Sequence, residues 1–140
     1  MNKKRVDALI LPAITVLKNL KIADANGKID STFRSQISAF GASVIMGSFK
    51  SAIAFYAKQG NSDVDRALLI RAMYCLVSGC ENTNVSGEYI FHQICCADNL
   101  AQIQEDYINA SIALKLAMNF FDLDKGTKEE GNEESEPAVQ

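Results

Sequence analysis

Apolar residues recur at helical spacing along almost the whole chain. Between its only two prolines, Pro12 and Pro137, they follow steps of three and four, and no stretch alternates convincingly with the period of two that a strand requires. The pattern therefore predicts an all-α fold, a compact bundle of about five to six helices.

Turn and capping residues indicate where these helices begin and end. The first helix is expected over about residues 4–22, with Pro12 as a kink or a break in its first turns. A turn at Asn26-Gly27 follows, and Asp30 or Ser31 caps the second helix. The remaining signals are Gly47-Ser48 between the second and third helices, Gly60 and then Asn61 or Ser62 before the fourth, Gly79 at its end, Ser86 at the start of the fifth and Asp98 at the start of the last.

The last predicted helix carries the most regular apolar stripe. Its members are Leu100, Ile103, Tyr107, Ala110, Leu114, Ala117 and Phe121. A repeat of this kind can form a two-chain coiled coil, but among several other amphipathic helices we expect it to pack inside its own bundle.

The composition favours one domain with a separate tail. A chain of 140 residues with 48% hydrophobic content suits one core, which we expect over residues 1–124. Residues 125–140 hold five Glu, no aromatic residue and only Val139 as a bulky aliphatic one, which predicts a disordered acidic tail. No secretion signal or membrane-length apolar run is apparent, so we expect a cytoplasmic protein with reduced cysteines and no membrane contact.

Charge is distributed unequally along the chain. Residues 1–71 carry eleven Lys and Arg against five Asp and Glu, whereas residues 72–140 carry three against twelve. Without the tail, the body of the chain, residues 1–124, has no net charge. Its first part, residues 1–71, still has a net charge of +6, and residues 72–124 have a net charge of −6. Such polarity is typical of a domain with one surface for a polyanion and another for basic partners.

The basic residues of the first half are the candidates for RNA contact. They lack a base-reading motif, so they suit sequence-independent contact with phosphates, although for any one of them a solvated helix surface is the simpler interpretation. The candidate residues are Lys4, Lys18, Lys21, Arg34, Lys50, Lys58, Arg66 and Arg71.

The sequence offers little for catalysis or metal binding. With one histidine, no nucleophile elbow and no phosphate-binding glycine loop, no enzyme is predicted and no cofactor is expected. The loop at residues 24–30 resembles the middle of a calcium-binding loop, but its register puts Ile22 and Phe33 where carboxylates are required. One alternative remains, a zinc or thiol redox module, for which the candidate ligands are Cys75, Cys80, His92, Cys95 and Cys96. Buried free cysteines at packing positions would explain the same cysteines.

One segment resembles a known family. Residues 33–60, FRSQISAFGASVIMGSFKSAIAFYAKQG, are similar to the signature of the small α-helical subunit of type III-B CRISPR-Cas (Cmr) RNA-targeting effector complexes. Phe33 occupies the position of the aromatic residue in that signature, Phe40-Gly41 the position of Leu-Pro, and Val44 the position of Ile. Gly47-Ser48-Phe49 stands for Asn-Gly-Leu, and the stretch at 52–55 for Ala-x-Ala-Phe.

The closing segment extends the resemblance over most of the body, because Tyr107 and residues 110–121 occupy the place of the family's C-terminal helix. The resemblance implies a non-catalytic subunit that stacks beside backbone subunits and copies of itself, and that helps to hold guide RNA and target RNA in antiviral defence. Cutting of the target belongs to a different subunit of such complexes. The family has no single motif for RNA contact, so the eight basic residues come from the charge distribution alone.

Overall fold

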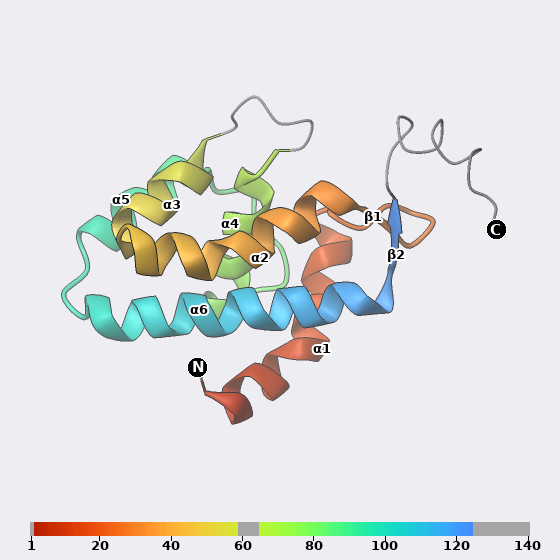
Figure 1. Cartoon of the computed structure of the whole chain (residues 1–140), viewed down its shortest axis with the longest axis horizontal. Helices are drawn as coiled ribbons and strands as arrows, with labels where there is room; N and C mark the ends of the chain where they lie inside the picture. Colours follow the sequence, from red (N-terminus) through yellow and green to blue (C-terminus); the bar gives the residue numbers. More distant parts are fainter. Residues whose placement is uncertain (1, 59–64, 125–140) are drawn as a thin grey trace.

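The computed structural model describes residues 2–58 and 65–124. This part of the chain is a helical bundle, which confirms the predicted all-α class (Figure 1). Its helices are α1 (Lys3–Asn19), α2 (Ser31–Met46), α3 (Phe49–Ala57), α4 (Ala67–Ser78), α5 (Gly87–Cys95) and α6 (Leu100–Ala117), followed by the 3-10 turn η1 (Met118–Phe120). The predicted tail at 125–140 lies outside the described residues, as do Gly60, Asn61 and Ser62.

Helix α6 is the central element of the bundle. It packs against α1, α2 and α4, and Figure 1 shows α2 running beside it and α1 crossing it. Its Tyr107, Ala110, Leu114 and Ala117 side chains are buried, whereas Leu100 and Ile103 are partly buried at the edge of the core. The prediction that the heptad stripe packs inside its own bundle is therefore confirmed, except that Phe121 lies just beyond the helix.

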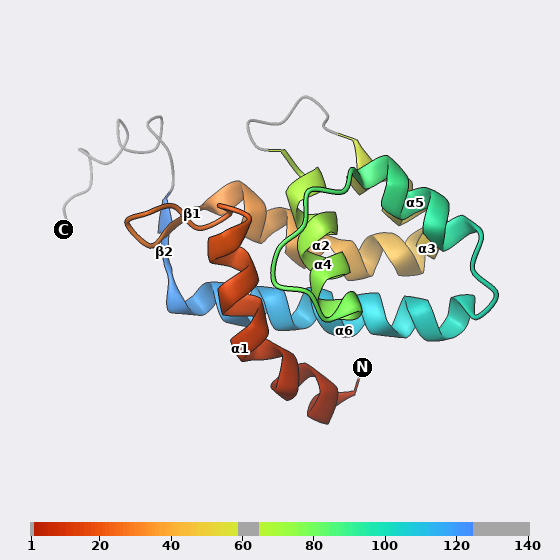
Figure 2. The ribbon, with the colours of Figure 1, turned by 180° about the vertical axis from the view of Figure 1, so that it is seen from behind.

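Helix α1 continues through Pro12, and Figure 2 shows it changing direction near its middle. This is the kink expected of a residue that has no N–H to donate to the preceding turn. The helix ends at Asn19, three residues before the predicted end at Ile22. Lys21 has a φ of 63°, and this left-handed conformation turns the chain out of the helix.

A short pair of parallel strands lies at this end of the bundle and was not predicted. Strand β1 (Lys28–Asp30) pairs with β2 (Asp122–Asp124) in the register Lys28 to Asp122. The predicted turn precedes β1, with Gly27 at a φ of 77°. The Asp24 carboxylate accepts hydrogen bonds from the backbone N–H groups of Asn26 and Lys28, both at 2.9 Å, so it closes the turn.

Most of the other capping predictions are confirmed. Asp30 caps α2 by accepting a hydrogen bond from the Thr32 N–H at 2.8 Å, and Ser86 caps α5 in the same way. Gly79 ends α4 in the left-handed conformation. The prediction for the last helix was wrong, because its N-cap is Asn99 rather than Asp98 and makes no side-chain hydrogen bond.

Candidate nucleic-acid interface

Three of the eight candidate basic residues lie at the end of the bundle where α1 ends and α2 begins (Figure 1). Lys18 and Lys21 are exposed and border an open depression beside the Asp24–Gly27 turn and Phe121. Arg34 lies in the first turns of α2, and its guanidinium donates a hydrogen bond to Asn119 Oδ1 at 2.6 Å. The fold therefore gathers Lys18, Lys21 and Arg34 at one end, which we call the basic end, although Asp24, Asp30 and Asp122 lie at the same end in the turn and the two strands.

Lys50 lies far from the basic end. It is exposed in the first turn of α3, beyond the opposite end of α2 from Arg34. Since α2 has 16 residues, it spans about 24 Å at about 1.5 Å per residue. Lys50 and the basic end can therefore contact the same RNA only at well-separated phosphates.

Of three further candidates, two are held by interactions inside the chain and the third is partly buried. Lys58 Nζ lies 3.3 Å from Glu88 Oε2 in an exposed ion pair between α3 and α5. Arg66 Nε donates a hydrogen bond to the Phe55 carbonyl at 2.7 Å, and its guanidinium carbon is 4.0 Å from the centre of the Phe55 ring. Arg71 is half-buried, and its Nε lies in the interior. These side chains are less free to meet phosphates than Lys18, Lys21 and Lys50.

The remaining candidate, Lys4, is exposed in the first turn of α1. Its neighbour Arg5 forms an ion pair with Asp106 of α6 at 3.3 Å. The eight residues are therefore spread over several surfaces of the bundle and do not form one patch. What the structure brings together is the basic end, with Lys50 at a distance from it.

The α2–α3 pair has a surface that the sequence analysis missed. Residues 31–57 contain no acidic residue, and the groove between the two helices has a floor of small side chains such as Ala39, Ala42 and Ser51. Three large apolar side chains stand out of the surface of this pair, with exposed fractions of 82% for Ile45, 86% for Met46 and 58% for Phe55. These three residues do not belong to the apolar stripe by which α2 and α3 face the core. An apolar residue outside that stripe was the sequence signal that could have indicated an exposed apolar surface.

The candidate metal ligands do not assemble. His92, Cys95 and Cys96 are exposed on or beside α5, whereas Cys75 is buried in α4. Within residues 2–58 and 65–124, no three His, Cys, Asp or Glu side chains are grouped so that they could hold a metal ion. The described part of the chain therefore gives the zinc alternative no support.

Cys75 and Cys80 are neighbours because of the way α4 ends. After the left-handed Gly79, the Cys80 N–H donates a hydrogen bond back to the Cys75 carbonyl at 3.0 Å. Burial, followed by the hydrogen bond and charge of the Cys80 thiol, raises the pKa of Cys75 to about 12. Such a thiol stays protonated at neutral pH, so Cys75 itself is a poor nucleophile.

No protein-family model, curated protein or solved structure matches the chain. None of the helices in the described part combines the length and the apolar character that crossing a bilayer requires. The observations that bear on function are therefore the site residues and the resemblance of residues 33–60 and 107–121.

Proposed function

We propose that this chain is a non-catalytic small subunit of a type III-B CRISPR-Cas effector ribonucleoprotein, acting in the cytoplasm in antiviral defence. The α2–α3 pair carries the proposal, because the segment that resembles the family signature folds as two helices joined at Gly47-Ser48, where the family has Asn-Gly. The all-α fold and the central α6 agree with the helical architecture that the resemblance implies.

RNA contact in this role is electrostatic. The basic end and Lys50 offer separated positive charges that suit an extended phosphate backbone, on which several weak contacts add together. A neutral body binds a polyanion weakly in isolation, so we expect retention of guide RNA and target RNA chiefly in the assembled complex, where many subunits act together.

Contact with sibling subunits in this role falls to the α2–α3 pair. Ile45, Met46 and Phe55 project from it, and exposed apolar side chains of this size commonly mark protein–protein contacts. The absence of acidic residues from residues 31–57 favours a partner surface that carries acidic side chains around an apolar centre. The sibling backbone subunits and further copies of this chain are the partners that the proposal names.

The test is reconstitution of the complex from this chain, its sibling subunits and guide RNA. We expect the chain to co-purify with the siblings. Replacing Lys18 and Lys21 together by Glu should lower the retention of target RNA. The plot of the logarithm of RNA affinity against the logarithm of salt concentration should also become shallower, with a slope smaller by about 1.5 for two lost phosphate contacts. The matched control is a Lys3→Glu, Lys115→Glu variant, which changes the net charge equally but lies outside the candidate set.

The two parts of the proposal fail separately. If the chain does not assemble with the sibling subunits, the family assignment is wrong. If it assembles and the Lys18→Glu, Lys21→Glu variant retains RNA as well as the control variant does, the basic end is not an RNA-binding surface.

A further inference from the structure

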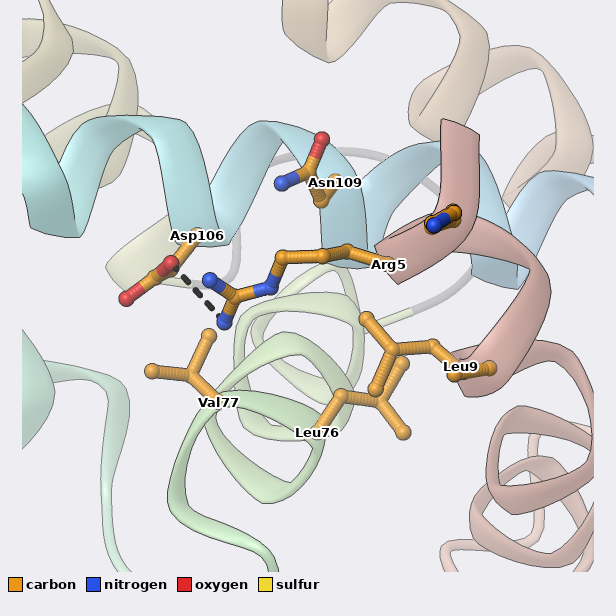
Figure 3. Close-up of a pocket in the computed structure, with 8 residues that line it drawn as sticks. Arg5, Leu9, Leu76, Val77, Asp106 and Asn109 are labelled. Atoms are coloured by element: carbon orange, nitrogen blue, oxygen red, sulfur yellow. Dashed lines mark ion pairs between the residues drawn. The ribbon is translucent and has the colours of Figure 1, made fainter. Parts of the chain in front are cut away.

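A cavity of about 240 Å³ opens between the first turns of α1, the end of α4 and the middle of α6 (Figure 3). It is remote in sequence from the α2–α3 pair and does not include any residue of the basic end. Four apolar and four polar residues line it: Ala8, Leu9, Leu76 and Val77, and Lys4, Arg5, Asp106 and Asn109.

The most informative of these residues is Asn109, which is 1% exposed. The backbone N–H of Asn2 donates a hydrogen bond to Asn109 Oδ1 at 3.0 Å. This contact fixes the orientation of the amide, because the oxygen and not the NH₂ group must face that donor. In Figure 3 the Nδ2 atom lies on the side of Arg5 and Asp106, away from the amide oxygen.

Asn109 Nδ2 is buried and has no hydrogen-bond partner in the part of the chain that the structure describes. Buried amide donors are almost always paired, because leaving one without an acceptor is unfavourable. Asn109 therefore lines the cavity with a buried donor that lacks an acceptor in the described part of the chain.

The charges around the cavity favour an anion as that acceptor. Arg5 Nη2 lies 3.3 Å from Asp106 Oδ1, and Gln102 Nε2 donates a hydrogen bond to the same oxygen at 2.9 Å. The negative charge of Asp106 is thus offset by Arg5, and Lys4 leaves the lining with an excess of one positive charge. The Arg5 side chain is 55% exposed and keeps further N–H donors for a ligand.

The size and the apolar wall argue against a small inorganic anion. A ligand that fills the cavity also contacts Leu9, Leu76 and Val77, so burying an apolar group there is favourable. Since an apolar cavity of about 150 Å³ holds the six carbons of benzene, this one suits roughly eight to ten non-hydrogen atoms.

We propose that this cavity binds a small organic carboxylate. One carboxylate oxygen accepts the hydrogen bond of Asn109 Nδ2 and the group lies near Lys4 and Arg5, while a short aliphatic chain packs against Leu9, Leu76 and Val77. The site includes no residue of the basic end and not Lys50, on which the proposed RNA contact rests, although it shares Lys4 with the eight RNA-contact candidates.

Hexanoate is a suitable probe, and the readout is the side-chain amide signal of Asn109 in ¹H–¹⁵N NMR spectra of the full chain. The signal is assigned from its loss in the Asn109→Asp variant, which keeps an oxygen for the Asn2 N–H but removes the donor. We expect hexanoate to shift this signal in a saturable manner. Hexan-1-ol and hexylamine lack the carboxylate, and inorganic phosphate lacks the chain, so each should bind at least about tenfold more weakly.

Two variants at the rim keep the test independent of folding defects in the core. Lys4→Gln should weaken hexanoate binding by about threefold to tenfold, because it removes the uncompensated charge. Lys3→Gln is the matched control, since Lys3 is exposed on the same turn but does not line the cavity, and it should leave binding unchanged.

The proposal is overturned if hexanoate leaves the Asn109 amide signal in place throughout the titration, which would mean that the carboxylate does not reach Nδ2. It is overturned equally if hexan-1-ol or phosphate binds as tightly as hexanoate. A third contradicting result is an equal loss of affinity in Lys3→Gln and Lys4→Gln, which would indicate non-specific attraction to the positive end of the chain.

Discussion

Gly87 lies where α5 packs closely against the end of α3. A Cβ atom at this position would lie 2.8 Å from the Ala57 Cα and 2.9 Å from the Ala57 carbonyl carbon. Both are backbone atoms, so a side chain at Gly87 cannot be accommodated unless α3 and α5 move apart. Gly41 in α2 is the opposite case, because a Cβ atom there would meet nothing within 4 Å.

The same substitution should therefore have opposite effects at the two glycines. We expect Gly87→Ala to lower the free energy of unfolding by about 2–3 kcal/mol through overpacking. Gly41→Ala should raise it by about 0.5–1 kcal/mol, because alanine favours the helix. Urea unfolding followed by circular dichroism measures both, and a loss of stability in Gly41→Ala equal to that in Gly87→Ala would contradict the close approach.

Residues whose role is local could be predicted from the sequence, whereas residues whose role depends on distant partners could not. Gly27 and Gly79 were predicted as a turn and a helix end, because their left-handed conformations follow from the chain on either side. The role of Gly87 depends on Ala57, thirty residues away, and that of Asn109 on Asn2. The only local sign of the Asn109 site was a polar side chain next to the apolar stripe of α6.

At the scale of elements, the junction between α2 and α3 is held by a reciprocal pair of hydrogen bonds. Ser48 Oγ accepts from the Ser51 N–H, and Ser51 Oγ accepts from the Ser48 N–H, both at 3.0 Å. Helix α3 has only nine residues, and a helix of this length is not stable alone in water. Its start therefore depends on this capping box and on packing against α2 and α5.

Ser48→Ala should lower the free energy of unfolding by about 1 kcal/mol, because it removes the acceptor for the Ser51 N–H. Ser38→Ala is the matched control, since its hydroxyl only donates to the Arg34 carbonyl within α2, and it should change stability little. Thermal unfolding of both variants decides the point, and a loss in Ser38→Ala as large as in Ser48→Ala would mean that the capping box does not stabilise the junction.

Most helices could be predicted from the sequence because their stripes and caps are local features. The β1–β2 pair could not be, since three residues are too few to show alternation and the two strands are about ninety residues apart. The early end of α1 was equally hidden. It depends on the left-handed Lys21 and on a hydrogen bond from the Ala23 N–H to the Leu17 carbonyl, neither of which has a clear sequence signal.

At the scale of the whole molecule, the charge asymmetry of the sequence is partly cancelled by the fold. Helix α6 from the acidic half packs against α1 and α2 from the basic half, and the pairs Arg5–Asp106 and Lys58–Glu88 join the two halves directly. A division into +6 and −6 along the chain therefore does not produce two opposite faces. What remains are the basic end, Lys50 and the acid-free surface of α2 and α3.

Two tyrosine hydroxyls and one cysteine thiol, buried in three different helices, should make the stability of the whole bundle depend on pH in the alkaline range. Burial raises the pKa of the Tyr56 and Tyr107 hydroxyls, and burial together with Cys80 raises the pKa of Cys75 to about 12. On unfolding, these groups enter water and lose their protons at lower pH than in the folded state. Above about pH 9 the unfolded chain therefore binds fewer protons, and stability must fall as pH rises.

Tyr107→Phe should make this alkaline loss shallower while keeping the ring that packs against Phe49. Each such group steepens the decline by at most about 1.4 kcal/mol per pH unit, and Tyr107 contributes above about pH 10, where an exposed tyrosine ionises. Urea unfolding from pH 7 to 11 in the presence of a reductant measures the slope. Wild-type and Tyr107→Phe curves that stay parallel above pH 10 would show that the Tyr107 hydroxyl is not shielded from water in the folded bundle.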